Sequence, residues 1–407
     1  MTHNGLMRTV EEHRRAVADL IAPTAEVSLP VEDAVGHALA ADLVAPRPLP
    51  AFDNSAMDGY AVRAADVGSA TPETPVTLPV AADVPAGRTD GPALEPGTAH
   101  RIMTGAAMPR GADTIVQVEH TDAGTTTVRI DRPAAAGRHL RRAGEDVQTG
   151  ETVLPAGGGL GPAQIALAAA LGLPELTVGE PVRVLVLSTG SELVEPGTEL
   201  LHGQIHESNG PMLVTAAREA GAHAVRRHFV ADDEDTFLTV LDAVVDAGAA
   251  DLILTSGGVS AGAFEVVKDA LAARGVEFTR VAMQPGKPQG TGRYRGVPVV
   301  TLPGNPVSAM VSFEVFVRPA IRAAMGFADP GRPRLTARLA ESLTSPADRA
   351  QFRRGVLDRV AGTVTTQGPP GSHHLRWMAA SNCLLEIPVG VTEMAAGDPV
   401  VVWDLEA

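Results

Sequence analysis

Three short apolar runs in the central part of the chain predict strands of one β-sheet. They span residues 251–255, 276–283 and 297–302, and each is followed by a loop of glycine, proline and small polar residues. Short apolar runs that are rich in β-branched residues and alternate with helical patterns are typical of buried parallel strands. Ligands of open α/β sheets bind where such strands end. We therefore expect the loops TSGGVS, QPGKPQG and LPGNPVS to converge on one crevice.

The segments before these runs extend the same pattern. A strand is predicted at 182–187, a helix capped by Asn209 runs to residue 220, and another strand follows at 222–230. Asp232 begins a further helix, because acidic side chains near a helix N-terminus complement the helix dipole. Strands and helices that alternate in this way predict a doubly wound α/β domain.

Shorter patterns flank this domain on both sides. The apolar spacing of residues 7–21 predicts an amphipathic helix, and further helices are expected at 32–40 and 164–172. From 75 to 130 the chain consists of short extended runs between glycine and proline, which indicates a small mainly-β module. Short strand patterns return after residue 328 and predict a small β barrel or sandwich.

Length and charge limit the class of protein. A chain of 407 residues exceeds the usual single core, so several domains are expected. The formal net charge of -15 argues against nucleic acid or an anionic membrane as the main partner, and it requires a locally positive pocket for an anionic substrate. The chain has no apolar run near the roughly 18 residues of a spanning helix and no signal-peptide core in residues 1–30, so we predict a cytoplasmic protein.

Cysteine and histidine usage gives no sign of a metal cluster. The single cysteine, Cys383, excludes an internal disulfide and a cysteine-cluster metal site. It lies in the apolar run SNCLLEIP, which favours a small buried residue over a nucleophile. His202 and His206 have i, i+4 spacing, but Gly203 lies between them, so we interpret them as loop residues.

The loop after the third apolar run has the features of an anion site. Gly304 permits a tight turn, Asn305 suits a helix N-cap, and Pro306 suits the first helical position. Free N–H groups at a helix N-terminus attract negative charge. The glycine pair at 257–258 lets a backbone approach a ligand, and Lys287 adds a point charge for an oxyanion. Each loop alone also fits an ordinary α/β turn, but three in order favour a site.

These motifs carry a resemblance to a known family. TSGGVSAG, PGKP and LPGNPVSA, in this order, resemble the molybdopterin-binding domain shared by MoeA, gephyrin and the MogA-type adenylyltransferases. PAFDNSAMDGYAV at residues 50–62 is specific to the MoeA and gephyrin branch. The likeness extends over nearly the whole chain, so what is expected of that branch is expected of the whole sequence.

The resemblance implies a fold class of multidomain α/β plus β. A doubly wound, MogA-like molybdopterin-binding domain is expected at 179–328, followed by a small β barrel at 329–407. Residues 1–46 and 145–178 are expected to form an elongated N-terminal dimerisation domain. A mainly-β domain at 47–144 is expected to be inserted into it.

The resemblance also implies catalytic residues. Asp58, Thr104 and Asp146 match functional positions of the family, where they reach the partner's pocket across a dimer interface; by itself, an aspartate in a turn is usually only a cap. Glu192 follows a strand and matches a position that binds pterin N–H groups or Mg²⁺. The catalytic set implied is Asp58, Thr104, Asp146, Glu192, Lys287, Arg354 and Ser372, with Asp58 and Glu192 as the metal ligands.

Further positions match the ligand pocket of the family. Arg354 in QFRRG and Ser372 in PPGSHH match residues that receive an oxyanion, through a planar guanidinium and a hydroxyl. Without the resemblance, Arg354 would fit a solvated strand face and Lys268 a surface lysine. The cofactor-binding set implied is Thr189, Gly190, Asp232, Ser256, Gly257, Gly258, Ser260, Glu265, Lys268, Pro303, Gly304, Asn305 and Ser308.

Two positions depart from the family pattern. Glu265 stands where many relatives carry Asp, and Gln284 stands where many carry Lys before PGKP. Glu265 has one methylene more than Asp, which displaces its carboxylate. Gln284 lacks the positive charge of Lys, but its amide still donates hydrogen bonds. Both departures bear on catalytic efficiency and on the choice of substrate.

The activity that the resemblance implies is that of a molybdopterin molybdenumtransferase. Such an enzyme of molybdenum cofactor biosynthesis inserts molybdate into adenylylated molybdopterin with Mg²⁺ and releases AMP. The partners implied are a second copy of the chain, a molybdopterin adenylyltransferase and cofactor-accepting enzymes. One alternative is a gephyrin-like scaffold that binds peptides of partner proteins. Another is a molybdopterin adenylyltransferase, which residues 50–62 and the C-terminal β domain argue against.

Overall fold

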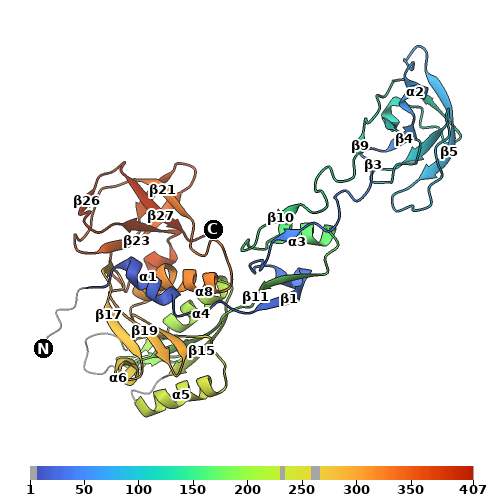
Figure 1. Ribbon diagram of the computed structural model, residues 1–407. Coiled ribbons are helices and arrows are strands. Elements are labelled where there is room, and N and C mark those ends of the chain that lie inside the picture. Colours follow the sequence, from blue (N-terminus) through green and yellow to red (C-terminus); the bar gives the residue numbers. More distant parts are fainter. Residues whose placement is uncertain (1–6, 230–233, 258–265, 407) are drawn as a thin grey trace. The chain divides into compact units, whose positions relative to one another are not determined.

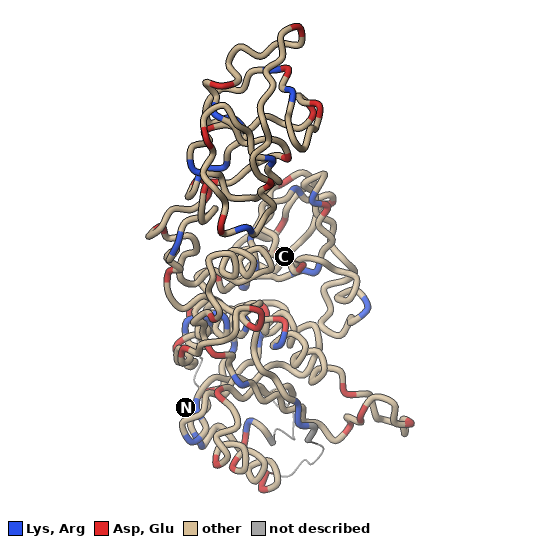
Figure 2. The backbone as a smooth tube through the Cα atoms, turned by 90° about the vertical axis from the view of Figure 1, so that its right-hand side faces the viewer, with Lys and Arg blue, Asp and Glu red and all other residues tan. Residues whose placement is uncertain are grey.

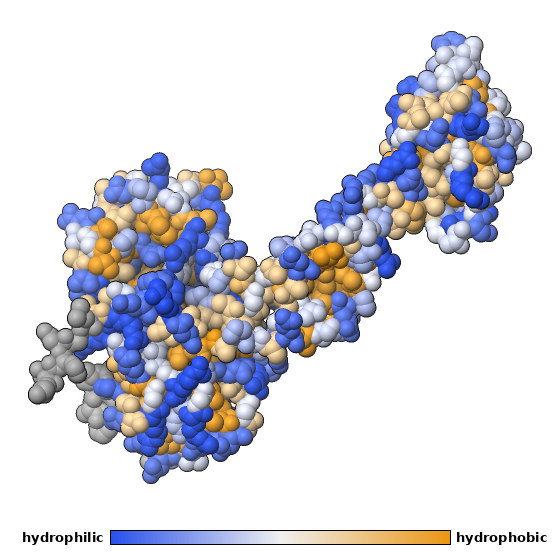
Figure 3. Space-filling view, viewed as in Figure 1, coloured by the Kyte–Doolittle hydropathy of each residue, from blue (hydrophilic) through white to orange (hydrophobic). Residues whose placement is uncertain are grey.

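The computed structural model of the protein describes residues 7–229, 234–257 and 266–406 (Figure 1). Its contacts divide the chain into two compact units. The first comprises residues up to 41, 156–161 and 175–407, and the second comprises 42–155 and 162–174. Along the backbone, basic positions are interspersed with acidic ones (Figure 2), and apolar residues lie among hydrophilic ones on the visible surface (Figure 3). Among the described residues, no helix is long and apolar enough to cross a membrane.

A six-stranded sheet forms the centre of the first unit. Its order is β15, β12, β16, β20, β19, β17. The bounds are β12 (Arg183–Thr189), β15 (His223–Phe229), β16 (Leu252–Ser256), β17 (Val276–Arg280), β19 (Pro288–Tyr294) and β20 (Val297–Leu302). β15, β12, β16 and β20 are parallel to one another, whereas β19 is antiparallel to both β20 and β17. The predicted doubly wound domain is confirmed.

The prediction of a buried parallel strand at 276–283 is wrong. β17 lies at the edge of the sheet, pairs antiparallel with β19, and buries only its first residue, Val276. The apolar pattern arose because Val281, Ala282 and Met283 are buried after the strand has ended. Since β19 is antiparallel to both of its neighbours, β17 nevertheless runs in the same direction as β20. The loops after these two strands therefore leave the sheet at the same edge.

Helices cover both faces of this sheet (Figure 1). Their bounds are α4 (Asn209–Glu219), α5 (Glu234–Asp246), α6 (Val266–Ala272), α7 (Pro306–Ser312) and α8 (Arg318–Ala324), with a π-helical segment (Phe313–Val317) between the last two. One hydrophobic core joins α4, α7 and α8 to the sheet, and a second core joins α5 and α6 to it. Val184 and Val186 of β12 belong to the first core and Leu185 and Leu187 to the second, because successive side chains of a strand point to opposite faces.

A closed five-stranded barrel forms the C-terminal part of the first unit, as predicted. Its order is β23, β24, β21, β27, β25, and pairing of β25 with β23 closes the ring. The bounds are β21 (Arg334–Leu339), β23 (Ala350–Asp358), β24 (Thr363–Thr366), β25 (Cys383–Ile387) and β27 (Pro399–Asp404), with β22 (Leu343–Thr344), β26 (Glu393–Met394) and α9 (Leu375–Ala379) beside them. Cys383 is buried, as expected, and burial raises its pKa to about 12.

Two short strand pairs connect segments around the sheet. β18 (Met283–Gln284) follows β17 and pairs parallel with β23 of the barrel. β13 (Leu193–Val194) pairs parallel with β14 (Ile205–His206) in the connection between β12 and α4. The segment after β17 is therefore held on one side by the sheet and on the other by the barrel.

A buried histidine anchors the N-terminal helix to the sheet. α1 (Val10–Ala18) begins in a capping box, within the helix predicted at 7–21. The His13 ring is fully buried, lies edge-on against Phe316, and has its Nε2 atom 3.3 Å from Oε1 of Gln289. Burial, and after it the charge of Arg8, lowers the pKa of His13 to about 4. The ring is therefore neutral at physiological pH.

The helix predicted at 32–40 is absent. A 3₁₀ turn (Val31–Ala34) follows β1 (Glu26–Pro30), which pairs antiparallel with β11 (Glu175–Gly179). Gly36 has a φ of 83°, a left-handed conformation that a helix does not continue through. Leu39 is buried against the β1–β11 pair instead, where it forms a bridge with Val178, and Val35 is exposed.

The second unit is mainly β, as predicted for residues 75–130. Its five-stranded sheet has the order β7, β4, β6, β5, β8. The bounds are β4 (Gly59–Val62), β5 (Val76–Val84), β6 (Ala99–Ile102), β7 (Thr114–Gln117) and β8 (Thr127–Ile130), with α2 (Ala64–Val67) and a 3₁₀ turn (Val118–His120). The short pairs are β3 (Asn54–Ser55) with β9 (Leu140–Arg141) and β2 (Leu43–Val44) with β10 (Thr152–Leu154). α3 (Pro162–Ala170) matches the helix expected at 164–172.

We predict that mild acid destabilises the first unit through His13. A histidine whose pKa is lower in the folded protein takes up its proton more readily when unfolded, so stability is greatest above pH 6.5 and is lost as the pH falls toward 4. One pKa unit corresponds to about 1.36 kcal/mol, so the loss should reach roughly 3 kcal/mol at most. His13→Gln should flatten this part of the pH dependence.

Urea unfolding followed by tryptophan fluorescence measures this effect, because Trp377 and Trp403 both lie in the first unit. His202→Gln is the control, since His202 is exposed. Equal slopes between pH 7 and pH 4 for the wild type and His13→Gln would show that another group carries the effect.

Candidate active site

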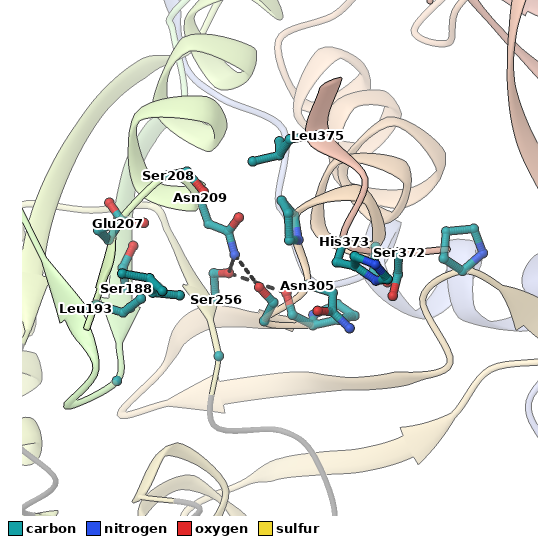
Figure 4. Close-up of a pocket in the computed structure, with 18 of the residues that line it drawn as sticks. Ser188, Leu193, Glu207, Ser208, Asn209, Ser256, Asn305, Ser372, His373 and Leu375 are labelled. Atoms are coloured by element: carbon teal, nitrogen blue, oxygen red, sulfur yellow. Dashed lines mark hydrogen bonds between the residues drawn. The ribbon is translucent and has the colours of Figure 1, made fainter. Parts of the chain in front are cut away.

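A cavity of about 1030 Å³ lies at the carboxyl edge of the central sheet (Figure 4). Its walls come from the ends of β12, β16 and β20, from the segment after β17, and from residues just before α4. The barrel contributes a further segment that contains Ser372 and His373. The predicted convergence of the loops TSGGVS, QPGKPQG and LPGNPVS is thus confirmed for their described residues.

Most of the predicted pocket residues line this cavity. They are Thr189, Gly190, Glu192, Ser256, Gly257, Lys287, Pro303, Gly304, Asn305, Ser308 and Ser372. Asp232, Gly258, Ser260 and Glu265 lie outside the described residues. Lys268 on α6 and Arg354 on β23 are described, but neither is part of the lining.

Gly257 is required by the backbone at the end of β16. It has a φ of 100°, and a Cβ atom there would lie 2.6 Å from the carbonyl oxygen of Thr189. Gly304 faces no such restriction, because its φ is not left-handed and the nearest atom to an added Cβ would be Cα of Gly257 at 3.5 Å. The close approach of two loops therefore depends on Gly257, whereas the tight turn expected at Gly304 does not need a glycine.

The start of α7 is partly as predicted. Asn305 occupies the N-cap position and Pro306 follows it, but the Asn305 side chain makes no capping hydrogen bond. The backbone N–H of Val307 donates to the carbonyl of Ser372 at 3.1 Å. One of the helical N–H groups that was expected to face an anion thus holds the barrel segment in place.

Arg354 supports the cavity wall from behind. Its side chain is buried, and its guanidinium donates to the carbonyl of His374 at 3.1 Å and to that of Pro369. Burial, and after it the charge of Arg353, lowers the pKa of Arg354. The described contacts therefore make Arg354 a support of the loop that carries Ser372, and they show no contact of its guanidinium with the cavity.

Asn209 links two of the cavity loops, a role that the sequence did not reveal. It is the first residue of α4 and not its cap, because Ser208 occupies the N-cap position, so the predicted cap is wrong. Its Nδ2 atom donates to Oγ of Ser256 at 2.8 Å and to the carbonyl of Gly304 at 2.6 Å (Figure 4). The only signal for this role was the polar run HESNG directly before the helix.

A partly buried ion pair lies beside Asn209 at the start of α4. Glu207 is 1% exposed and accepts hydrogen bonds from the Gly210 N–H at 2.6 Å and from Nη1 of Arg226 at 3.1 Å. A Cβ atom at Gly210 would lie 2.6 Å from Cδ of Arg226 and 2.8 Å from Oγ of Ser188. A larger residue at this position would therefore require these side chains to move, and the Gly210 N–H bond ties the start of α4 to buried Glu207.

Three polar atoms of this wall are buried and have no hydrogen-bond partner among the described residues. They are Oγ of Ser188, Oγ1 of Thr189 and Oδ1 of Asn209, and all three residues line the cavity. A buried polar atom without a partner costs about 1–3 kcal/mol. This wall is therefore suited to a ligand that supplies hydrogen bonds.

A lysine supplies positive charge to the lining of the cavity. Lys287 is half-buried there, and it is the only Lys or Arg among the described lining residues. Gln284, beside it, accepts a hydrogen bond from Nε2 of Gln351 at 3.3 Å, which leaves its own amide N–H groups to donate. Ser308 and Ser372 add hydroxyl groups to the lining. One cation and several neutral donors are thus available to an anion.

The residues predicted in the N-terminal half lie in the second unit. Oδ1 of Asp58 accepts hydrogen bonds from the backbone N–H of Thr104 at 2.7 Å and from its hydroxyl at 2.9 Å, and the former is the main reason that the pKa of Asp58 is lowered. Asp146 is exposed. Two of the three predicted residues, 46 positions apart in sequence, are thus in contact.

No preformed metal cluster is present in the described parts of the chain, where no group of three His, Cys, Asp or Glu side chains is placed to hold an ion. Glu192 is exposed in the cavity lining, and its carboxylate lies against Gly190. Mg²⁺ commonly uses only one or two protein carboxylates and takes its other ligands from phosphates and water. Asp58 and Glu192 each have a carboxylate, which is the type of ligand that Mg²⁺ requires from a protein.

The sheet, its cavity and the barrel segment define a class of α/β proteins that bind small ligands at the ends of parallel strands. A model of the MoeA N-terminal region (domain I and II) matches residues 8–172, and one of a probable molybdopterin binding domain matches residues 185–323. A model of the MoeA C-terminal region (domain IV) matches residues 336–405. The chain belongs to the MoeA family.

Relatives match over the full length of the chain. It is 58% identical to molybdopterin molybdenumtransferase 2 of Mycobacterium tuberculosis, with 98% of this chain and 100% of the relative covered. It is 36% identical to molybdopterin molybdenumtransferase of Synechococcus elongatus, covering 96% and 98% of the two chains. The crystal structure of the molybdopterin biosynthesis MoeA protein of Pyrococcus horikoshii has a TM-score of 0.82 at 28% identity and covers 98% of this chain and 100% of that one.

We predict that Gly257→Ala destabilises the first unit and Gly304→Ala does not. The first change places a Cβ at a left-handed φ and 2.6 Å from a carbonyl oxygen, whereas the second meets only ordinary contacts. The expected loss for Gly257→Ala is about 1 kcal/mol or more. Thermal unfolding of the two variants side by side measures it, and equal melting temperatures would contradict the assignment.

Proposed function

We propose that the protein inserts molybdate into adenylylated molybdopterin and releases AMP. Membership of the MoeA family supports this reaction, and so do the relatives named molybdopterin molybdenumtransferase that match over the whole chain. The observation that carries it is the cavity lined both by Lys287 and by three residues with unsatisfied polar atoms. The whole-length matches favour this reaction over the adenylyltransferase and scaffold alternatives.

The substrate has two chemically different ends, and the lining of the cavity contains groups that suit each of them. Its phosphates suit Lys287, whose ammonium attracts an anhydride, together with the neutral donors of Gln284, Ser308 and Ser372. Its N–H-bearing rings suit the wall of Ser188, Thr189 and Asn209. We infer that the chain acts by holding and orienting the phosphoanhydride for cleavage, since a nucleophilic triad is not needed for that step.

Molybdate is a substrate and needs its own oxyanion contacts. Ser372 supplies a hydroxyl in the lining, and Arg354 holds the loop on which Ser372 lies. We propose that Arg354 contributes to the molybdate site by holding this loop. Direct contact of its guanidinium with molybdate would require a change in the loop at 369–374. Mg²⁺ bound by Asp58 and Glu192 would neutralise charge on the phosphates.

We further propose that the active enzyme is a homodimer in the cytoplasm. Asp58, Thr104 and Asp146 belong to one compact unit and the cavity to the other, so a site assembled from two copies of the chain accommodates both sets. A single, buried and unpaired cysteine suits a reducing compartment.

The central experiment measures AMP release from adenylylated molybdopterin by the purified protein with Mg²⁺ and molybdate. Release that depends on molybdate supports the transferase. Gln284→Lys tests whether a second cation beside Lys287 raises the rate. Absence of release with both the wild type and Gln284→Lys would reject the proposed activity.

Lys287→Ala should lower kcat/KM for this reaction by about tenfold or more, because a hydrogen bond from a charged donor is worth about 1.5–3 kcal/mol. Lys287→Arg should retain part of the activity, since it keeps the charge. Arg338→Ala is the matched control, because it removes one positive charge from the exposed surface of the barrel. A loss as large for Arg338→Ala would mean that only net charge matters.

Mixing two inactive variants tests the shared site. In a dimer whose sites combine Asp58 of one copy with Glu192 of the other, half of the sites in an Asp58→Ala/Glu192→Ala heterodimer are intact. After statistical exchange, the mixture should recover about a quarter of the wild-type activity. If both carboxylates act within one chain, the mixture should stay inactive.

A further inference from the structure

We propose that Oδ1 of Asn209 recognises an N–H donor on the heterocyclic end of the ligand, and that Asn209 thereby determines specificity. The residue lines the cavity, and this atom is buried and has no hydrogen-bond partner in the described ranges of the chain. Figure 4 shows the side chain between Ser208 and Ser256, at the edge of the cavity. This inference rests on the proposed function for the identity of the ligand.

The orientation of the amide follows from its partners. Nδ2 of Asn209 lies 2.6 Å from the carbonyl oxygen of Gly304, which can only accept, so the nitrogen must be on that side. The same nitrogen donates to Oγ of Ser256 at 2.8 Å. Both N–H groups are therefore used, and Oδ1 is left as an acceptor whose direction is fixed by two bonds.

The surroundings prevent Asn209 from satisfying Oδ1 by moving. The residue opens α4, where the next N–H, that of Gly210, is bonded to buried Glu207, and its own amide is held by Ser256 and Gly304. A preorganised acceptor of this kind binds its partner without a further ordering cost. An acceptor can be satisfied only by a donor, so the ligand must present an N–H or O–H group here.

The neighbouring hydroxyls narrow the chemistry of this ligand group. Oγ of Ser188 and Oγ1 of Thr189, at the end of β12, are also buried without a partner, and hydroxyls both donate and accept. A ring that carries an exocyclic amine beside a ring nitrogen has the complementary pattern. Adenine and pterin share this feature, and either end of adenylylated molybdopterin could supply it.

Isothermal titration with two ligand pairs tests the proposal and separates the two sources. One pair is AMP and purine riboside 5′-monophosphate, which lacks the amine, and the other is 6-hydroxymethylpterin and the same compound without its 2-amino group. We expect the wild type to bind the amine-bearing member of one pair about tenfold more tightly. The pair that shows the preference identifies the end of the substrate.

Asn209→Ala should abolish this preference, and Thr215→Ala should keep it, because Thr215 is on the same helix with its hydroxyl bonded to backbone carbonyls of α4. The preference is a ratio measured on one protein, so a general loss of stability does not alter it. A ratio near one in the wild type for both pairs, or an unchanged ratio in Asn209→Ala, overturns the proposal. If the wild type prefers the amine-bearing ligand but shows no molybdate-dependent AMP release, the proposed reaction is rejected and the role of Asn209 still holds.

Discussion

The common direction of β12, β16, β17 and β20 is the constraint on which the site depends. Parallel pairing brings the carboxyl ends of β12, β16 and β20 to one edge of the sheet, and the two antiparallel pairings of β19 give β17 the same direction. Four loops distant in sequence therefore leave the sheet together. The cavity follows from this topology, because each loop contributes residues to the same lining.

Contact between the sheet and the barrel completes the cavity. β18 pairs with β23, the Val307 N–H binds the Ser372 carbonyl, and Arg354 holds the loop between them through two carbonyls. None of these contacts is an ion pair. They are therefore specific in geometry and little affected by salt. The barrel thus serves the site as a fixed support for one of its walls.

The sequence predicted those features of the fold that depend on local backbone conformation and on burial. Gly257, Pro306 and the apolar strand runs follow from backbone conformation and burial, and the resemblance placed most of the lining residues. The sequence pattern failed at β17. The buried residues Val281, Ala282 and Met283 follow this edge strand, so the apolar run in the sequence is longer than the strand. Arg354 and Asn209 could not be placed, because their roles depend on carbonyl groups that only the tertiary structure brings near. The four-part domain division and the shared dimeric site remain predictions.

The distribution of charge in the cavity suits an enzyme that must release what it binds. The chain carries a net charge of -15, and the lining that the structure describes offers only Lys287 as a cation of the Lys or Arg type. Hydroxyl and amide donors direct an anion without the strong attraction of further ammonium groups. Binding that is equally strong for the substrate and the transition state does not raise kcat. Weak attraction of the bound substrate, combined with precise positioning of its phosphates, therefore favours the chemical step. The hydrogen bonds of Asn209 to Ser256 and Gly304, and the bond of the Gly210 N–H to buried Glu207, contribute to that positioning.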